Sequence, residues 1–105
     1  MFAGMKESLA DINAIIRQQF TGVGDRLKLL REALGYRKAT PFAKDLGLEG
    51  PTYRTYERGE KLPPHEVLGR LRELTGASTD WILYGDRAGL TTKLYRVLYS
   101  VDSEA

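Results

Sequence analysis

Glycine and proline residues divide this chain into short segments. Within each segment, apolar residues recur three or four positions apart, which is the spacing of one face of an α-helix. The prolines stand where helices are expected to begin, and glycines stand where helices are expected to end. No segment sustains the apolar-polar alternation that is typical of a half-buried strand. The sequence therefore predicts an all-α protein.

The helices can be placed from these breaks. A first helix is expected over residues 8–20, with the apolar stripe Leu9, Ile12, Ile15, Ile16 and Phe20. The central helices are expected to begin, in chain order, at Asp25 as N-cap, at Thr40 before Pro41, at Gly50 before Pro51, at Pro63-Pro64 and at Ser78 as N-cap. They are expected to end, in the same order, at Gly35, Gly47, Gly59, Gly76 and Gly85. A last helix carries Leu90, Leu94, Val97, Leu98 and Val101.

The apolar positions of the central helices form the predicted core. They are Leu27, Leu30 and Leu34, then Phe42, Ala43 and Leu46, then Val67, Leu68, Leu71 and Leu74, and finally Trp81, Ile82 and Leu83. A chain of 105 residues has room for one such core with short extensions.

Composition argues against enzymatic chemistry. The chain has no cysteine, which excludes a disulfide, a thiolate nucleophile and a cysteine-based zinc site. His65 is the only histidine, it follows Pro64 at an expected helix start, and no nucleophile or metal ligand pairs with it in the sequence. A glycine-rich phosphate loop, a zinc-binding histidine pair and a serine elbow are all missing. We therefore expect no catalysis, no metal and no cofactor or small-molecule ligand.

Charge and hydropathy indicate in which part of the cell the protein is expected. Sixteen Lys and Arg against 14 Asp and Glu leave a net charge of only +2, so the position of the basic residues matters more than their sum. The chain lacks an export signal and an apolar run of membrane-spanning length. These features predict a cytoplasmic protein without membrane contacts.

From about residue 24 to residue 86 the sequence resembles the Cro and phage-repressor helix-turn-helix family. The resemblance is carried by the segments 26–31 (RLKLLR) with Gly35, 42–48 (FAKDLGL), 52–60 (TYRTYERGE) and 75–85 (TGASTDWILYG), together with Pro63, Leu68 and Leu71. It implies a lambda-repressor-like domain of five packed helices, in which the second and third helices form the helix-turn-helix. We accordingly divide the chain into an N-terminal extension helix, 1–22, a DNA-binding domain, 23–86, and a C-terminal helix and tail, 87–105.

The resemblance also implies a function, which is transcriptional regulation of phage or prophage repressor type by binding double-stranded DNA. The recognition helix would lie in the major groove, with Tyr53 and Tyr56 anchoring it from beneath. Its outward positions are Gly50, Pro51, Thr52, Arg54 and Thr55, while Arg37, Lys38, Lys44, Arg58 and Lys61 lie where phosphates would pass. The family further implies a partly buried ion pair, here between Arg31 and Glu57.

Some positions depart from the family pattern. Ala39 stands where a glutamine is usual, Glu49 stands where a serine or threonine cap is common, and one extra residue separates Gly35 from Ala43. Together with Gly50, these departures keep open a second hypothesis, in which the same fold binds a protein as an antitoxin, antirepressor or inhibitor.

Oligomeric state is also open. Family members commonly bind pseudo-palindromic operators as dimers. We expect a homodimer formed mainly through the C-terminal segment around Leu94, Tyr95, Leu98 and Tyr99, the alternative being that this segment packs on its own domain.

Overall fold

The computed structural model describes residues 21–99. This part of the chain is helical and contains no strand, which confirms the predicted all-α class. Its six helices, in chain order, are α2 (Val23–Ala33), α3 (Ala39–Asp45), α4 (Gly50–Glu57), α5 (His65–Thr75), α6 (Thr79–Tyr84) and α7 (Thr92–Tyr99). The helix expected over residues 8–20 lies outside the described residues.

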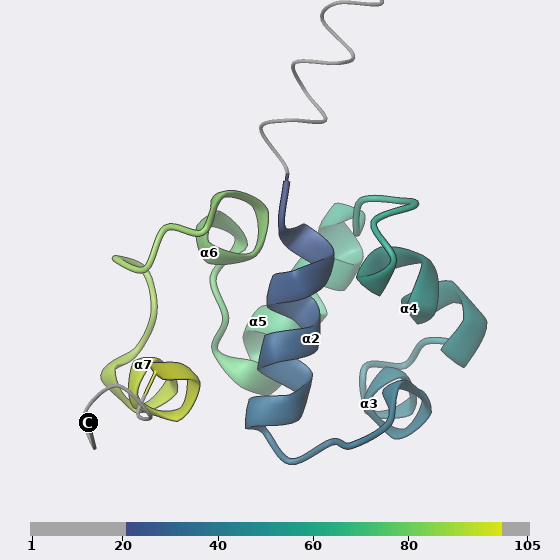
Figure 1. Ribbon diagram of the computed structural model, residues 1–105, viewed down its shortest axis with the longest axis horizontal. Helices are drawn as coiled ribbons and strands as arrows, with labels where there is room; N and C mark the ends of the chain where they lie inside the picture. Colours follow the sequence, from purple (N-terminus) through teal and green to yellow (C-terminus); the bar gives the residue numbers. More distant parts are fainter. Residues whose placement is uncertain (1–20, 100–105) are drawn as a thin grey trace, which may run out of the picture.

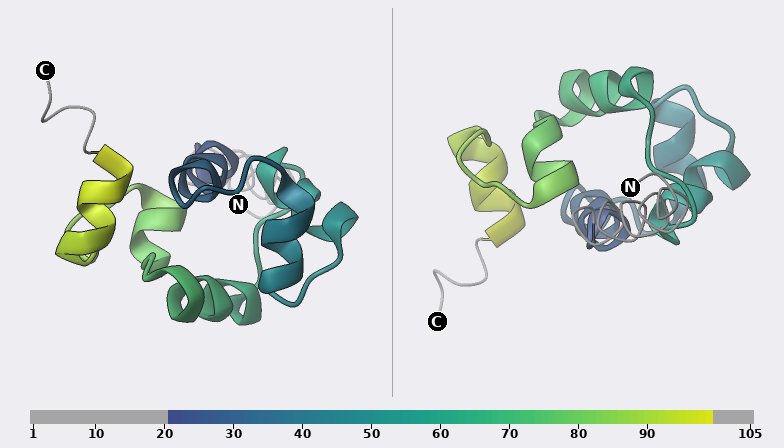
Figure 2. Two further views of the ribbon diagram at one scale, coloured as in Figure 1. Left: turned by 90° about the horizontal axis from the view of Figure 1, so that it is seen from below. Right: turned by 90° about the horizontal axis from the view of Figure 1, so that it is seen from above.

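Helix α2 is the central element of the domain (Figure 1). Helices α3 and α4 lie on one side of it, α6 and α7 lie on the other, and α5 lies behind. Seen from below and from above, α5 lies across the domain from α2, between the α3–α4 pair and α6 (Figure 2). Helix α2 contacts α4, α6 and α7 directly. The arrangement therefore leaves α3 and α4 at one end of the molecule and α7 at the other.

The core is built from the apolar stripes that face α2 and α5. The largest side chains in it that are fully shielded from solvent are Trp81, Tyr53, Phe42, Leu27, Leu30, Leu71 and Ile82. The rings of Phe42 and Tyr53 meet edge to face, with centroids 5.4 Å apart and an interplanar angle of 84°. This contact joins α3 to α4 inside the core.

Two leucines assigned to the predicted core are exposed instead. Leu34 follows the last residue of α2 as its C-cap and is 36% exposed. Leu74 is 47% exposed and lines an open pocket between the end of α3 and α5. Both lie at helix ends, where the neighbouring elements no longer cover the apolar stripe.

Four helix starts differ from the prediction. Helix α5 begins at His65, with Pro64 as its N-cap, one residue after the expected proline pair. Helix α2 begins at Val23 after a left-handed Gly22, so Asp25 lies in its first turn and is not its N-cap. Helix α3 begins at Ala39, with Lys38 as N-cap, and so includes Thr40 although proline follows it. Helix α4 begins at Gly50, and the N-cap is Glu49, whose side chain makes no capping hydrogen bond. The prediction for Ser78 was right, because its hydroxyl accepts a hydrogen bond from the Trp81 amide.

The C-terminal helix α7 packs on its own domain. Leu94 and Leu98 are buried in the same core cluster as the residues of α2 and α6. The indole Nε1 of Trp81 donates a hydrogen bond to the hydroxyl of Tyr99 over 2.9 Å, and the guanidinium of Arg87 lies 3.8 Å from the centre of the Tyr99 ring. The expectation that Leu94 and Leu98 face a second chain is thus wrong for these two side chains, because their own domain already covers them, whereas Tyr99 is half-buried.

Candidate nucleic-acid interface

Helices α3 and α4 pack against each other around a tight turn. Gly47 adopts a left-handed conformation, with φ +74°, which residues with a Cβ rarely adopt. Its amide donates to the Lys44 carbonyl and the Leu48 amide donates to the Ala43 carbonyl, which closes the end of α3. Ala43 is fully buried under this turn. These contacts fix the direction in which the chain enters α4.

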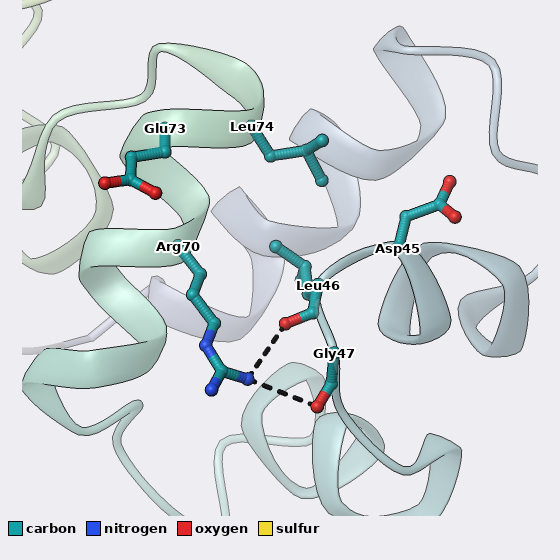
Figure 3. Close-up of a pocket in the computed structure, with 6 residues that line it drawn as sticks. All are labelled: Asp45, Leu46, Gly47, Arg70, Glu73 and Leu74. Carbon is teal, nitrogen blue, oxygen red and sulfur yellow. Dashed lines mark hydrogen bonds between the residues drawn. The ribbon is translucent and has the colours of Figure 1, made fainter.

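A side chain from α5 holds the same turn from the opposite side (Figure 3). Nη1 of Arg70 donates hydrogen bonds to the carbonyl oxygens of Leu46 and Gly47, over 3.1 and 3.2 Å. A Cβ at Gly47 would lie 2.9 Å from that nitrogen, so a glycine there also makes room for Arg70. The turn between α3 and α4 is therefore supported by the domain rather than only by its own backbone.

Helix α4 has one buried and one exposed face. Tyr53 and Tyr56 are buried beneath it, as expected for residues that anchor the helix. Pro51, Thr52 and Arg54 are exposed on its other face. A short helix held from below by aromatic side chains can present its outer face to a groove without rearrangement.

The hydroxyl of Tyr53 is buried without a hydrogen-bond partner. Burial, followed by the nearby Glu57 carboxylate, raises the pKa of Tyr53 far above its usual value. The phenol consequently stays neutral in the folded protein throughout the physiological range.

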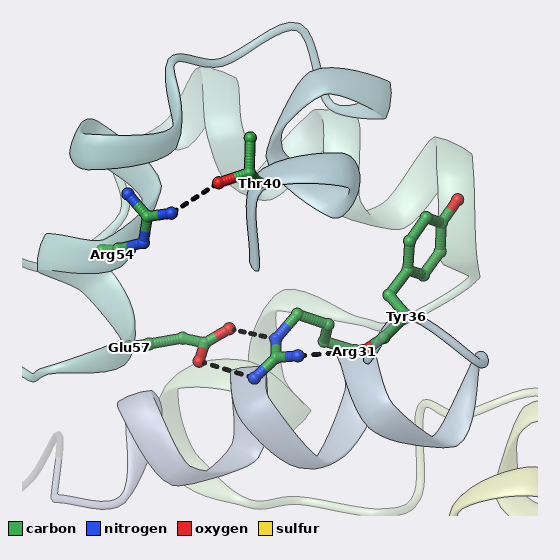
Figure 4. A network of polar contacts seen from close by, with 5 residues as sticks. All are labelled: Arg31, Tyr36, Thr40, Arg54 and Glu57. Atoms are coloured by element: carbon green, nitrogen blue, oxygen red, sulfur yellow. Dashed lines mark hydrogen bonds and ion pairs between the residues drawn. The ribbon is translucent and has the colours of Figure 1, made fainter. Parts of the chain in front are cut away.

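An ion pair ties the end of α4 to α2 (Figure 4). Arg31 donates to Glu57 through Nε, over 2.7 Å, and through Nη2, over 3.2 Å. Nη1 of the same guanidinium donates to the carbonyl of Tyr36 over 2.9 Å. Both charged side chains are largely shielded, with exposed fractions of 7% and 13%. The pair that the family resemblance implied is thus present, and it locks the last turn of α4 to the central helix.

A second polar contact joins the two helices at the outer surface. The guanidinium of Arg54, on α4, donates a hydrogen bond to the hydroxyl of Thr40, on α3 (Figure 4). Gly50 lies beneath this contact, and a Cβ there would be 3.1 Å from the Thr40 hydroxyl oxygen. Thr40 was not among the predicted site residues, because no periodic pattern relates it to a side chain on the next helix.

Most of the predicted contact residues are exposed, and two differ from the prediction. Lys38, Lys44, Pro51, Thr52, Arg54, Arg58 and Lys61 are all exposed. Gly50 is instead buried, because Thr40 and Arg54 close over it, so it is not an outward position. Thr55 is half-buried, and its hydroxyl donates to the carbonyl of Thr52 over 2.6 Å.

The charges at the end of α4 are partly paired. Nε of Arg58 donates to the carboxylate of Glu60 over 2.7 Å, and both side chains are about half exposed. Lys38 and Lys44 lie on or beside α3, and no ion pair with them is present in residues 21–99. Glu49 adds an exposed negative charge at the start of α4. The exposed basic residues at this end that make no ion pair within residues 21–99 are Arg37, Lys38, Lys44, Arg54 and Lys61.

Residues 21–99 contain neither a metal-binding cluster nor a membrane-spanning helix. No three acidic or histidine side chains gather there in a way that could hold a metal ion. None of the helices in this range is long and apolar enough to cross a membrane.

Comparisons with known proteins agree with this geometry. Residues 23–81, more than half of the chain, match the model of a helix-turn-helix domain family. Over 65 residues the chain is 37% identical to the SPbeta prophage-derived uncharacterized HTH-type transcriptional regulator YonR of Bacillus subtilis (strain 168), which covers 62% of this chain and 59% of that protein. No solved structure matches the chain significantly. The match, which runs from the start of α2 into the first turn of α6 and includes the packed α3–turn–α4 unit, shows that this chain belongs to the helix-turn-helix domain family.

Proposed function

We propose that this chain is a sequence-specific DNA-binding transcriptional regulator of phage or prophage repressor type, which places α4 in the major groove of double-stranded DNA. The observation that carries the proposal is the division of α4 into two faces. Tyr53 and Tyr56 are buried under the helix while Pro51, Thr52 and Arg54 are exposed on its outer face. A groove-reading helix needs this combination of a fixed base and an exposed polar face.

The charged side chains around α4 support the same function. Lys38 and Lys44 are exposed on the neighbouring helix, and neutralising phosphates with such residues supplies most of the affinity for DNA that is independent of sequence. The Bacillus relative is named an HTH-type transcriptional regulator, which supports this function. The match covers 59% of that relative.

Selection of bound fragments from a random double-stranded DNA library tests the proposal directly. We expect enrichment of a defined sequence, and we expect its affinity to fall steeply as salt is raised. Arg54→Ala is expected to weaken the preference for particular bases in the selected sequence. Arg72→Ala, which removes an equal charge from the exposed surface of α5, is the matched control and is expected to leave the sequence unchanged. Failure to enrich any sequence would contradict the proposal.

A homodimer on a pseudo-palindromic operator belongs to the same proposal. Helices α6 and α7 lie on the side of α2 opposite α4, and their side chains Tyr84, Tyr95 and Val97 are exposed (Figure 1). Pairing of two chains through that side would leave both copies of α4 free. The selected sequence would then be two-fold symmetric, with half-sites about 34 Å apart, which is one duplex turn. An asymmetric sequence bound by a single chain would argue against the dimer.

A protein-binding role is the second candidate. It is favoured by Glu49, exposed at the start of α4, and by the buried Gly50, which leaves few side chains at the tip of the helix to read bases. The two candidates respond differently to salt, because release of counterions from DNA makes its binding strongly salt-dependent. A protein interface that survives high salt and Arg54→Ala would favour the second candidate.

A further inference from the structure

The contact between Arg54 and Thr40 closes over a third residue, Gly50. Arg54 Nη2 donates to the Thr40 hydroxyl, across from one helix to the next. Gly50 provides the space beneath, since a Cβ there would lie 3.1 Å from the Thr40 oxygen and 3.5 Å from Arg54 Nη1. Gly50 is buried even though it is the first residue of an otherwise exposed helix start.

This contact restrains the one exposed side chain of α4 that can read a base with two hydrogen bonds. An unrestrained arginine loses much rotamer freedom when it binds, whereas one whose guanidinium plane is already held loses less. The bond to Thr40 occupies one N–H of the guanidinium, and the other donors stay available. The hydroxyl of Thr40, which accepts from Arg54, can also donate its own proton to a phosphate oxygen.

We propose that Thr40 and Gly50 determine base preference by positioning Arg54 toward the O6 and N7 edge of a guanine. This inference rests on the proposed DNA-binding function and deepens it. Thr40 acts through Arg54 and is a positioning residue, and Gly50 acts by leaving room. Guanine is the base whose major-groove edge offers two acceptors side by side to a planar fork of N–H donors.

The test compares affinities for two DNA fragments that differ at one base pair. That base pair is chosen as the position at which the wild-type protein prefers guanine and the Arg54→Ala variant does not. The first fragment carries guanine at this position, and the second carries adenine. The wild-type protein is expected to prefer guanine by about tenfold or more. Thr40→Val keeps the shape of the side chain and removes the hydroxyl, and its guanine preference is expected to fall by about three- to tenfold, the equivalent of one lost hydrogen bond.

Two further variants separate positioning from a general loss of structure. Thr40→Ser restores the hydroxyl and is expected to restore the preference, which a purely structural role of the threonine methyl would not do. Gly50→Ala is expected to reproduce the loss seen with Thr40→Val, because its Cβ crowds the contact. Thr92→Val, at the exposed start of α7, is the matched control and is expected to keep the wild-type preference.

The ratio of two affinities is insensitive to the fraction of folded protein, so a partly unfolded variant still gives an answer. Three results would each overturn the inference while leaving the DNA-binding function in place. They are full guanine preference in Thr40→Val, loss of the preference in Thr40→Ser, and tighter binding of the guanine fragment by Thr40→Val than by the wild-type protein. Wild-type protein without any preferred sequence would overturn both.

Discussion

Gly24 and the carbonyl of Glu57 lie so close together that a Cβ on Gly24 would sit 2.1 Å from the Glu57 oxygen. The obstacle is backbone, which unlike a flexible side chain has little freedom to move away. The second residue of α2 therefore packs directly on the last residue of α4. This approach, together with the Arg31–Glu57 ion pair, fixes α4 on the central helix from two directions.

Gly24→Ala is accordingly expected to lower the free energy of unfolding by about 3 kcal/mol or more, because the helices must separate to admit the methyl group. Gly69→Ala is the matched control. Gly69 lies inside α5, with open space where its Cβ would be, so alanine there is expected to raise stability by about 0.5–1 kcal/mol through helix propensity. Urea denaturation of both variants measures the difference, and equal effects would contradict the close packing.

The two ion pairs of the described chain provide a second comparison. Arg31–Glu57 and Arg58–Glu60 both close at 2.7 Å, but only the first is shielded from solvent. Arg31→Ala leaves a buried carboxylate without its partner and is expected to destabilise the protein by about 3 kcal/mol. Glu60→Ala is expected to change stability by less than about 0.5 kcal/mol, because an exposed pair is screened by water.

Replacing both members of the buried pair is expected to be milder than removing one. The variant with Arg31→Met and Glu57→Leu leaves no unpaired charge, so its loss of unfolding free energy should be smaller than that of Arg31→Ala. A double variant whose loss equals or exceeds the sum of the losses of Arg31→Met and Glu57→Leu alone would show that the two side chains are not energetically coupled, which would contradict this account of the pair.

Tyr53 predicts a particular response to alkaline pH. Its raised pKa means that the phenol ionises more readily in the unfolded chain than in the folded one. The stability it contributes is therefore fully present below about pH 10, the ordinary tyrosine value, and is lost as pH rises above it, by up to about 1.4 kcal/mol per pH unit.

Tyr53→Phe should remove this dependence while leaving stability at neutral pH unchanged or slightly higher, since the hydroxyl has no hydrogen-bond partner. The measurement is unfolding free energy from pH 8 to pH 11 for the two proteins. The pKa of Tyr36 is also raised, by its hydrogen bond to Asp45, but that residue is present in both proteins and cancels in the comparison. Parallel curves would contradict the burial of the Tyr53 hydroxyl.

Helix α7 gives a prediction about its packing partner. Leu98→Ala is expected to lower the free energy of unfolding by about 2–4 kcal/mol, because Leu98 is buried in the core of its own domain. Val97→Ala, at the exposed neighbouring position, is expected to change it by less than about 0.5 kcal/mol. If Leu98 faced a second chain instead, its effect would shrink as the protein is diluted to concentrations at which the chains separate, and thermal unfolding over a range of concentrations distinguishes the two cases.

Much of the fold could be predicted because its signals are local. Helix ends at Gly35, Gly47, Gly59, Gly76 and Gly85 follow from the ease with which glycine adopts a left-handed conformation, and each of these residues has a positive φ. The inward faces of the helices follow from the three- and four-residue spacing of apolar side chains. These properties depend on neighbours along the chain, so they can be recognised in the sequence.

The residues that were misjudged depend on contacts between helices. Thr40 is helical although it precedes a proline, and its hydroxyl bonds to Arg54 on the next helix. The sequence predicts Gly50 as an outward position, yet it is buried by the same contact. Leu74 continues an apolar stripe but lies where no element covers it. Two helix ends can be equally amphipathic, and only one of them is buried. The choice depends on packing against elements that are far away in the sequence.

The sequence by itself therefore determined an all-α chain, the order of its helices, the two tyrosines under α4 and the membership of the helix-turn-helix family that its motifs suggested. Only the tertiary structure decided that α7 covers its own core, that Arg70 holds the turn before α4, and that Arg54 donates a hydrogen bond to Thr40 above a buried Gly50. The physical reason is that helix formation depends on local backbone preference and apolar periodicity. The orientation of a long polar side chain instead depends on acceptors supplied by other helices.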